Sequence, residues 1–143
     1  MNVADLIRTR VQIYAISEQM TAHEAARYFR ERQVRAAGVL DGAGKLVGVL
    51  SQSDISDKVA AENKSAEIRV AEIMTRELVT VSPDLALDEC LRRMEKHGIF
   101  HLLVVDSQGV YRGMISVTDL LEIIASDQKA RADMLESFLY SQR

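Results

Sequence analysis

The chain contains two copies of one unit, and this internal duplication constrains its fold more than any other feature. Residues 3–7 resemble residues 70–74 at an offset of 67, and residues 39–55 resemble residues 104–120 at an offset of 65. In the second comparison six of 17 positions are identical, where unrelated stretches of ordinary composition would share about one. Two copies of roughly 60 residues are too few for a solenoid. The repeat therefore predicts two similar half-units related by a pseudo-twofold axis.

The first copy has the pattern of a small mixed α and β unit. After a short helix, we expect a strand at residues 13–16 and a helix over residues 22–33, with Ser17 as its N-cap. Apolar runs at residues 36–40 and 45–51 flank a glycine-containing turn and predict a hairpin.

The second copy repeats this plan. We expect a strand at residues 78–81, a helix that begins at the Ser-Pro pair 82–83 and stops at Gly98, and strands at residues 100–105 and 110–116. Because the strands are continuous apolar runs, both faces of each sheet should be buried. The prediction is an α/β (α+β) fold with two β-α-β-β-α repeats, in which helices cover small sheets.

The composition places the chain among globular proteins and narrows its partners. Hydrophobic residues make up 48% and charged residues 27% of the 143 residues, unlike disordered or membrane proteins. The net charge of −3 argues against nucleic acid as the main ligand, and no apolar run suits a transmembrane helix, so no membrane partner is expected. The first residues lack a secretory signal and Cys90, the single cysteine, has no internal disulfide partner. We therefore expect a cytoplasmic protein.

One motif recurs in both copies: Gly, two apolar residues, Ser, any residue, Ser or Thr, and Asp, at residues 48–54 and 113–119. It falls where a strand should give way to a helix. One interpretation is structural, with the Ser capping the helix and the Asp favouring the positive end of its dipole. The other is that N–H groups, hydroxyls and a carboxylate at one opening bind a ligand that carries a phosphate and a vicinal diol. Recurrence in both copies favours a ligand.

The duplicated pattern resembles a pair of cystathionine-β-synthase-type (CBS) domains. The resemblance rests on the doubled β-α-β-β-α order, on Leu-Val-Val-Asp at residues 103–106 and on the two Gly-to-Asp motifs, and it covers residues 3–125. It implies a stand-alone CBS pair with two clefts between its sheets, which bind adenosine-containing ligands such as AMP, ADP, ATP, NAD or S-adenosylmethionine. It implies no catalysis. AMP or ATP is the first expectation, as a regulatory ligand and not as a required cofactor.

The resemblance also implies nucleotide-binding roles for individual residues. Asp54 and Asp119 match the ribose-binding Asp of the family. The neighbouring hydroxyl positions are Ser51, Ser53, Ser116 and Thr118, and the backbone near the base falls at Ala15, Ile16, Thr80 and Val81. Where the family often has proline in its second strand, this chain has Gly38 and Leu103, a departure that affects contacts to the adenine edge.

Charge separates the two copies. Residues 1–66 contain nine basic and eight acidic residues, whereas residues 67–143 contain nine basic and thirteen acidic ones. Since a phosphate needs a cation, the first copy is the better host, and we expect Arg35 to reach a phosphate in its cleft. The matching position in the second copy is Phe100, with His101 beside it as a further candidate. The alternative is that Arg35 belongs to a solvated face together with the arginines of the preceding helix.

Other candidate sites are rejected. His23 begins an HExxH-like run, but Arg27 stands where the second His of a zinc site is required. His97 and His101 are four apart, yet a strand is expected to begin between them, so they cannot share a helical face. Cys90 lies on an apolar helix face and is expected to be a core thiol. No nucleophile is paired with a base, so we do not expect an enzyme.

The segment after the repeats predicts an amphipathic C-terminal helix that must bury its apolar side chains. It could pack on its own chain or on a partner chain. We favour the partner because the pair already looks complete, and since CBS-type pairs commonly dimerise, a homodimer is expected. The chain thus divides into CBS repeat 1 (residues 1–66), CBS repeat 2 (67–126) and this helix (127–143).

The expected function is a regulatory module that senses adenine nucleotides in the clefts between the repeats and signals to a protein partner. The alternative is a dimeric interaction scaffold whose clefts are degenerate and bind nothing.

Overall fold

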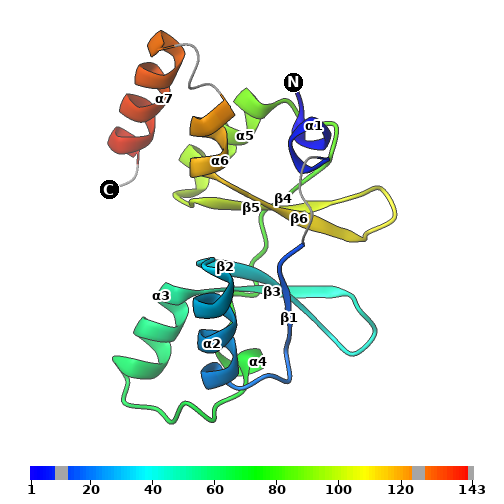
Figure 1. The fold of residues 1–143 in the computed structure, drawn as a ribbon, viewed down its shortest axis with the longest axis vertical. Coiled ribbons are helices and arrows are strands. Elements are labelled where there is room, and N and C mark those ends of the chain that lie inside the picture. The colour runs from blue at the N-terminus through cyan, green and yellow to red at the C-terminus, as the bar shows by residue number, and fades with distance from the viewer. Residues whose placement is uncertain (9–12, 124–127, 142–143) are drawn as a thin grey trace.

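The computed structural model describes residues 1–8, 13–123 and 128–141. Two three-stranded sheets face each other across the middle of the molecule, and the helices lie on their outer sides (Figure 1). The predicted α/β fold with two β-α-β-β-α repeats is therefore confirmed. Within the described ranges no helix combines the length and apolar character needed to cross a membrane.

The first half is built around the sheet order β1-β2-β3, with β1 parallel and β3 antiparallel to β2. Its elements are β1 (Ala15–Ser17), α2 (Ala22–Arg32), β2 (Ala36–Leu40), β3 (Leu46–Ser51) and α3 (Gln52–Ile55), which continues as a π-helical turn over Ser56–Ala60. The first four residues of β2 are buried, as the continuous apolar run predicted.

The predicted N-cap of α2 is wrong. Ser17 is the last residue of β1, and Thr21 caps the helix instead. The Thr21 hydroxyl oxygen accepts the Glu24 N–H at 3.1 Å, and the Glu24 carboxylate accepts the Thr21 N–H at 3.1 Å. This capping box satisfies two helix-end donors at once, which a lone Ser further upstream cannot do.

The second half repeats the arrangement with the order β4-β5-β6. Its elements are β4 (Thr80–Val81), α5 (Leu87–His97), β5 (His101–Val105), β6 (Tyr111–Ser116) and α6 (Val117–Ile123). Gly98 ends α5 with a φ of 65°, which confirms the predicted stop. The predicted start at residues 82–83 is wrong, because α5 begins at Leu87 with Ala86 as its N-cap. The Ser82 hydroxyl instead accepts the Asp84 N–H at 3.2 Å in a local turn.

The two short helices α1 (Val3–Ile7) and α4 (Val70–Ile73) are exchanged between the halves. Val3 is fully buried in the core of the second half, whereas Val70 and Ile73 are buried in the core of the first. The hydrogen bonds that hold them correspond closely: the Val3 N–H donates to the Leu85 carbonyl at 2.9 Å, and the Val70 N–H donates to the Met20 carbonyl at 2.8 Å. Each core is therefore completed by a helix from the other repeat.

A third cluster lies between the facing sheets, and Tyr111 is one of its buried residues. The Tyr111 ring packs over Gly38, where an added Cβ would come within 2.7 Å of the ring carbon Cζ. The Tyr111 hydroxyl donates to the Tyr14 carbonyl oxygen at 3.0 Å. Gly38 therefore leaves the space that this aromatic contact between the halves requires.

The C-terminal helix α7 (Gln128–Ser141) packs on α5 of its own chain (Figure 1). Met134 and Phe138 are buried in the second core, and the Ser137 hydroxyl donates to the Glu95 carboxylate at 2.6 Å. The preference for a partner chain as the cover of this apolar stripe is thus corrected, because the core of the second half extends far enough to receive it. Leu139 and Tyr140 remain exposed on the outer side.

Candidate ligand pocket between the two halves

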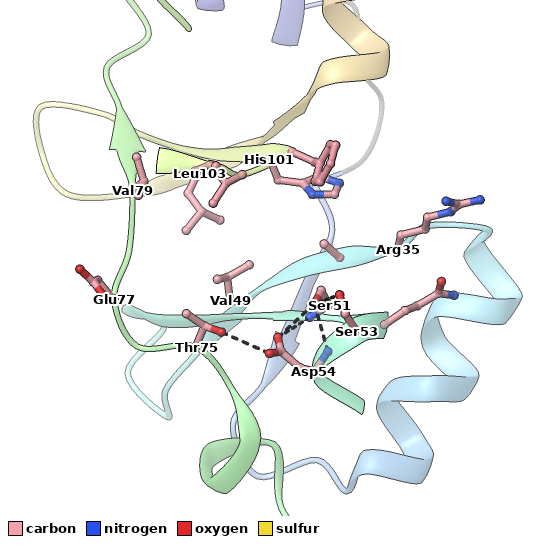
Figure 2. A pocket seen from close by; sticks show the side chains of 15 residues that line it. Arg35, Val49, Ser51, Ser53, Asp54, Thr75, Glu77, Val79, His101 and Leu103 are labelled. Carbon is pink, nitrogen blue, oxygen red and sulfur yellow. Dashed lines mark hydrogen bonds between the residues drawn. The ribbon is translucent and has the colours of Figure 1, made fainter. Parts of the chain in front are cut away.

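A pocket of about 710 Å³ opens between the two sheets. Figure 2 shows β3 and the start of α3 on one side, with the chain leading into β4 and the start of β5 on the other. Its lining residues are Arg35, Ala36, Val49, Ser51, Gln52, Ser53, Asp54, Thr75, Glu77, Val79, Gly98, Ile99, Phe100, His101 and Leu103. Five residues predicted to bind a nucleotide are brought together here: Arg35, Ser51, Ser53, Asp54 and His101.

Asp54 is the carboxylate of this pocket, and one of its oxygens is occupied by the helix cap. The Oδ2 atom accepts the Ser51 N–H at 2.9 Å and the Ser51 hydroxyl at 3.2 Å, while the Asp54 N–H donates to Ser51 Oγ at 3.2 Å. The structural interpretation of the motif is therefore fulfilled, since Ser51 and Asp54 form a capping box. Only Oδ1 is left to take part in other chemistry.

The second oxygen of Asp54 faces two groups that the sequence interpretation missed. Thr75 donates its hydroxyl to Oδ1 at 3.3 Å, and Lys58 places its ammonium 3.0 Å from the same oxygen. Lys58 also donates to the Ile73 carbonyl. The i,i+4 spacing of Asp54 and Lys58 could have revealed the ion pair. Thr75 carries no local signal, because it reaches Asp54 through the backbone bridge between Val49 and Thr75.

The pocket carries one permanent positive charge among its described lining residues, that of Arg35, against the carboxylates of Asp54 and Glu77. Figure 2 shows Arg35 and Glu77 at opposite ends of the pocket. Between them the wall is apolar, with Val49 from the first half opposite Val79 and Leu103 from the second. The site therefore combines an apolar middle with polar ends of opposite charge.

His101 and Phe100 close the pocket from the second half. Burial lowers the pKa of His101, the nearby Asp119 raises it, and Arg35 lowers it. Because the net direction is downward, the imidazole is neutral at pH 7 and does not add to the positive charge of Arg35. Phe100 is 50% exposed, and its ring lies 5.0 Å from that of Phe138 in α7.

The remaining predicted residues do not line this pocket. Ile16 and Val81 are buried in the first and second cores, Ala15 packs in the cluster between the sheets, and Thr80 is exposed. The segment that approaches the pocket is residues 75–79, just before the predicted Thr80 and Val81.

The second copy of the motif repeats the helix cap. The Ser116 N–H donates to Asp119 Oδ2 at 2.7 Å and the Asp119 N–H donates to Ser116 Oγ at 3.2 Å, while Thr118 is exposed at the start of α6. At the offset of 67, residues 8–12 correspond to residues 75–79. Four of them lie outside the described residues, so the cleft of this copy is not described.

Cys90 is a core residue, as predicted. Its side chain is fully buried, and burial raises the pKa of the thiol to about 11. A thiol with so high a pKa is not a nucleophile at neutral pH.

Comparison with known proteins agrees with this architecture. Residues 3–61 and 70–126 each match the CBS domain family. The CBS domain-containing protein YhcV of Bacillus subtilis is 30% identical over 129 residues, which are 90% of this chain and 89% of that protein. Two other curated relatives are longer, and this chain spans only 37% and 21% of their lengths.

Solved structures show the same arrangement. A protein with CBS domains from Burkholderia ambifaria MC40-6, named for signal transduction, is 30% identical and superposes with a TM-score of 0.82, covering 90% of this chain and 96% of that one. The CBS domain pair of protein MJ0100, solved with 5'-methylthioadenosine and S-adenosylmethionine, is 26% identical with a TM-score of 0.79, covering 88% and 97%. With both repeats matched and the whole pair superposed, the chain belongs to the CBS-domain family and contains two CBS domains arranged as a pair.

Proposed function

We propose that this chain is a regulatory module that binds an adenosine-containing ligand in the pocket at Asp54. The observation that carries the proposal is the position of Asp54 Oδ1, an acceptor inside a 710 Å³ pocket between the halves. A volume of this size is in the usual range for small-molecule sites, about 300–1,000 Å³. The adenosyl ligands of the MJ0100 domain pair support the same ligand class.

The ligand would bind by three kinds of contact. Ribose hydroxyls would donate to Asp54 Oδ1, taking the place of the Thr75 hydroxyl. The base would pack against the apolar middle of the pocket, and the 5' substituent would point toward Ser53 and Arg35. Since Arg35 is the one permanent cation among the described lining residues, and Asp54 and Glu77 line the same pocket, the pocket favours a ligand with a single anionic group, such as AMP or S-adenosylmethionine, over ATP.

Occupancy would reach a partner through Phe100. This side chain lines the pocket and contacts Phe138 of α7, so a ligand that favours one position of Phe100 also favours one position of α7. A ligand shifts such an equilibrium only by its differential affinity for the two arrangements. The exposed side of α7 would present the change to a protein partner.

Calorimetric titration with adenosine, AMP, ADP, ATP, NAD, 5'-methylthioadenosine and S-adenosylmethionine tests the proposal. Asp54→Asn should weaken binding of the preferred ligand about tenfold or more, since it removes a charged acceptor. The matched control is Asp57→Asn, an exposed carboxylate in the π-helical turn that does not line the pocket. Absence of heat and of thermal stabilisation with every ligand would overturn the proposal and favour an interaction scaffold with non-binding clefts.

A further inference from the structure

A second hollow, of about 550 Å³, lies between α5 and the chain that leads into β4. Its lining residues are Leu78, Val79, Thr80, Glu89, Arg92, Arg93, Lys96 and His97. It shares Val79 with the Asp54 pocket, and His97 directly precedes Gly98, which lines that pocket. The two cavities are therefore neighbours that have one segment of wall in common.

The charge of this hollow is opposite to that of the Asp54 pocket. Three cationic side chains of α5, those of Arg92, Arg93 and Lys96, face a single lining carboxylate, Glu89. Arg92 is neutralised, because its guanidinium contacts Glu89 at 2.7 Å and Asp88 at 3.3 Å. Arg93 and Lys96 make no ion pair or hydrogen bond within the described part of the chain. Arg93 and Lys96 thus line the hollow without an ion pair of their own among the described residues, in the half that carries the acidic excess.

The two cations have no counterpart at the equivalent positions of the first copy. At the offset of 65, the positions of Arg93 and Lys96 correspond to Tyr28 and Glu31 in α2, which ends in the same way with a left-handed residue after its last turn. Helix α2 therefore forms without cations at these positions. The cation pair Arg93 and Lys96 is therefore found in the second copy and not at the matching positions of the first.

We propose that this hollow binds a phosphate group. Arg93 can present two parallel N–H donors to phosphate oxygens, Lys96 supplies an ammonium, and the exposed Thr80 hydroxyl supplies a further donor. Leu78 and Val79 contribute the apolar part of the lining. The phosphate is either a free phosphoanion or one carried by a nucleotide whose nucleoside lies in the neighbouring pocket. The site itself does not depend on adenosyl binding at Asp54.

Calorimetric titration of the full chain with sodium pyrophosphate at low ionic strength tests the site. Wild type should bind, and Arg93→Gln/Lys96→Gln should bind about tenfold to hundredfold more weakly, as expected for the loss of charge-assisted hydrogen bonds. The matched control is Arg27→Gln/Arg30→Gln, which removes two exposed charges from α2 and should keep the wild-type affinity. Thermal unfolding of both variants checks that they remain folded. No binding by wild type, or equal weakening in the control, would overturn the proposal.

A second arm identifies the source of the phosphate and separates this proposal from the previous one. Pyrophosphate that binds together with saturating adenosine, and is not displaced by ADP, identifies a free phosphoanion. Pyrophosphate displaced by ADP but not by adenosine identifies a nucleotide-borne phosphate. Asp54→Asn should leave pyrophosphate affinity at the wild-type value, so a failure of adenosyl binding and a failure of the phosphate site are read from different titrations.

Discussion

The ring centroids of Phe100 and Phe138 are 5.0 Å apart, and the two ring planes make an angle of 56°. Phe100 lines the Asp54 pocket, and Phe138 is a buried residue of the C-terminal helix α7. This aromatic pair therefore joins the lining of the Asp54 pocket to α7.

Replacing Phe138 should detach α7. Phe138→Ala removes a buried ring, a change that destabilises a core by about 3–5 kcal/mol, and the loss falls on the contacts that hold one helix. We expect amide hydrogen exchange in α7 to accelerate, while amides in β2 stay protected. Leu139→Ala, at a side chain that is 70% exposed, is the control. Equal exchange in both variants would contradict the prediction.

Gly38→Ala should destabilise the contact between the halves. The new Cβ would lie 2.7 Å and 2.8 Å from two ring carbons of Tyr111, and such overpacking costs about 1–3 kcal/mol. Leu46 is the equivalent of Tyr111 in the first copy, so Tyr111→Leu introduces the residue found there. In this Tyr111→Leu background, Gly38→Ala should reduce the unfolding free energy by less. Urea unfolding of the two single variants and the double variant measures the difference. Strictly additive losses would show that the ring is not the obstacle.

Ser51→Ala should cost about 1 kcal/mol, because the Asp54 N–H and the Asp54 carboxylate each lose a capping partner. Ser53→Ala should change the unfolding free energy by less than about 0.5 kcal/mol, as for most exposed substitutions, since the hydrogen-bond partner of its hydroxyl among the described residues is the Ser51 hydroxyl. A similar loss in both variants would argue that the cap does not stabilise α3.

Protonation of His101 should lower the free energy of unfolding as the pH falls. Its folded-state pKa is lowered from 6.5 by burial, so below that pH the unfolded chain binds the proton more readily than the folded one. The unfolding free energy is therefore full above pH 6.5 and decreases as the pH drops toward the folded-state pKa. Urea unfolding of His101→Gln between pH 7.5 and pH 5 should show a flatter slope than wild type, whereas the exposed-site variant His97→Gln should keep the wild-type slope.

Cys90 should resist thiol reagents in the folded protein. With a buried thiol whose pKa is raised to about 11, the thiolate fraction at pH 8 is very small. Reaction with a disulfide reagent should then proceed at the rate of unfolding, and it should be immediate in denaturing urea. A fast reaction under native conditions would contradict the burial of this side chain.

Local patterns in the sequence predicted the elements, and contacts distant in the chain escaped prediction. The hairpin turns follow from Asp41 and Asp106, whose carboxylates each accept two backbone N–H groups of their own turn at 2.9 Å. The caps at Ser51 and Ser116 are equally local. By contrast, Thr75 reaches Asp54 across 21 positions, and no periodicity encodes such a contact.

The position of α7 escaped for the same reason. The apolar side chains of α7 had to be buried, but the sequence does not show against which surface they pack. Leu87 and Met94 belong to α5, whereas Phe100 lies just before β5. Only the folded second half brings these side chains to the face that receives Met134 and Phe138.

The exchange of α1 and α4 has a mechanical consequence for any signal. Each half binds a short helix of the other half through backbone hydrogen bonds. In α1, the N–H groups of Val3 and Ala4 donate to the carbonyls of Leu85 and Pro83. In α4, the N–H groups of Val70 and Ala71 donate to the carbonyls of Met20 and Glu18. A hinge motion about one linker would have to break the hydrogen bonds that hold one of these helices. The two halves are thus held together at two places, and we expect any relative movement of the sheets to be a small shear and not a wide opening.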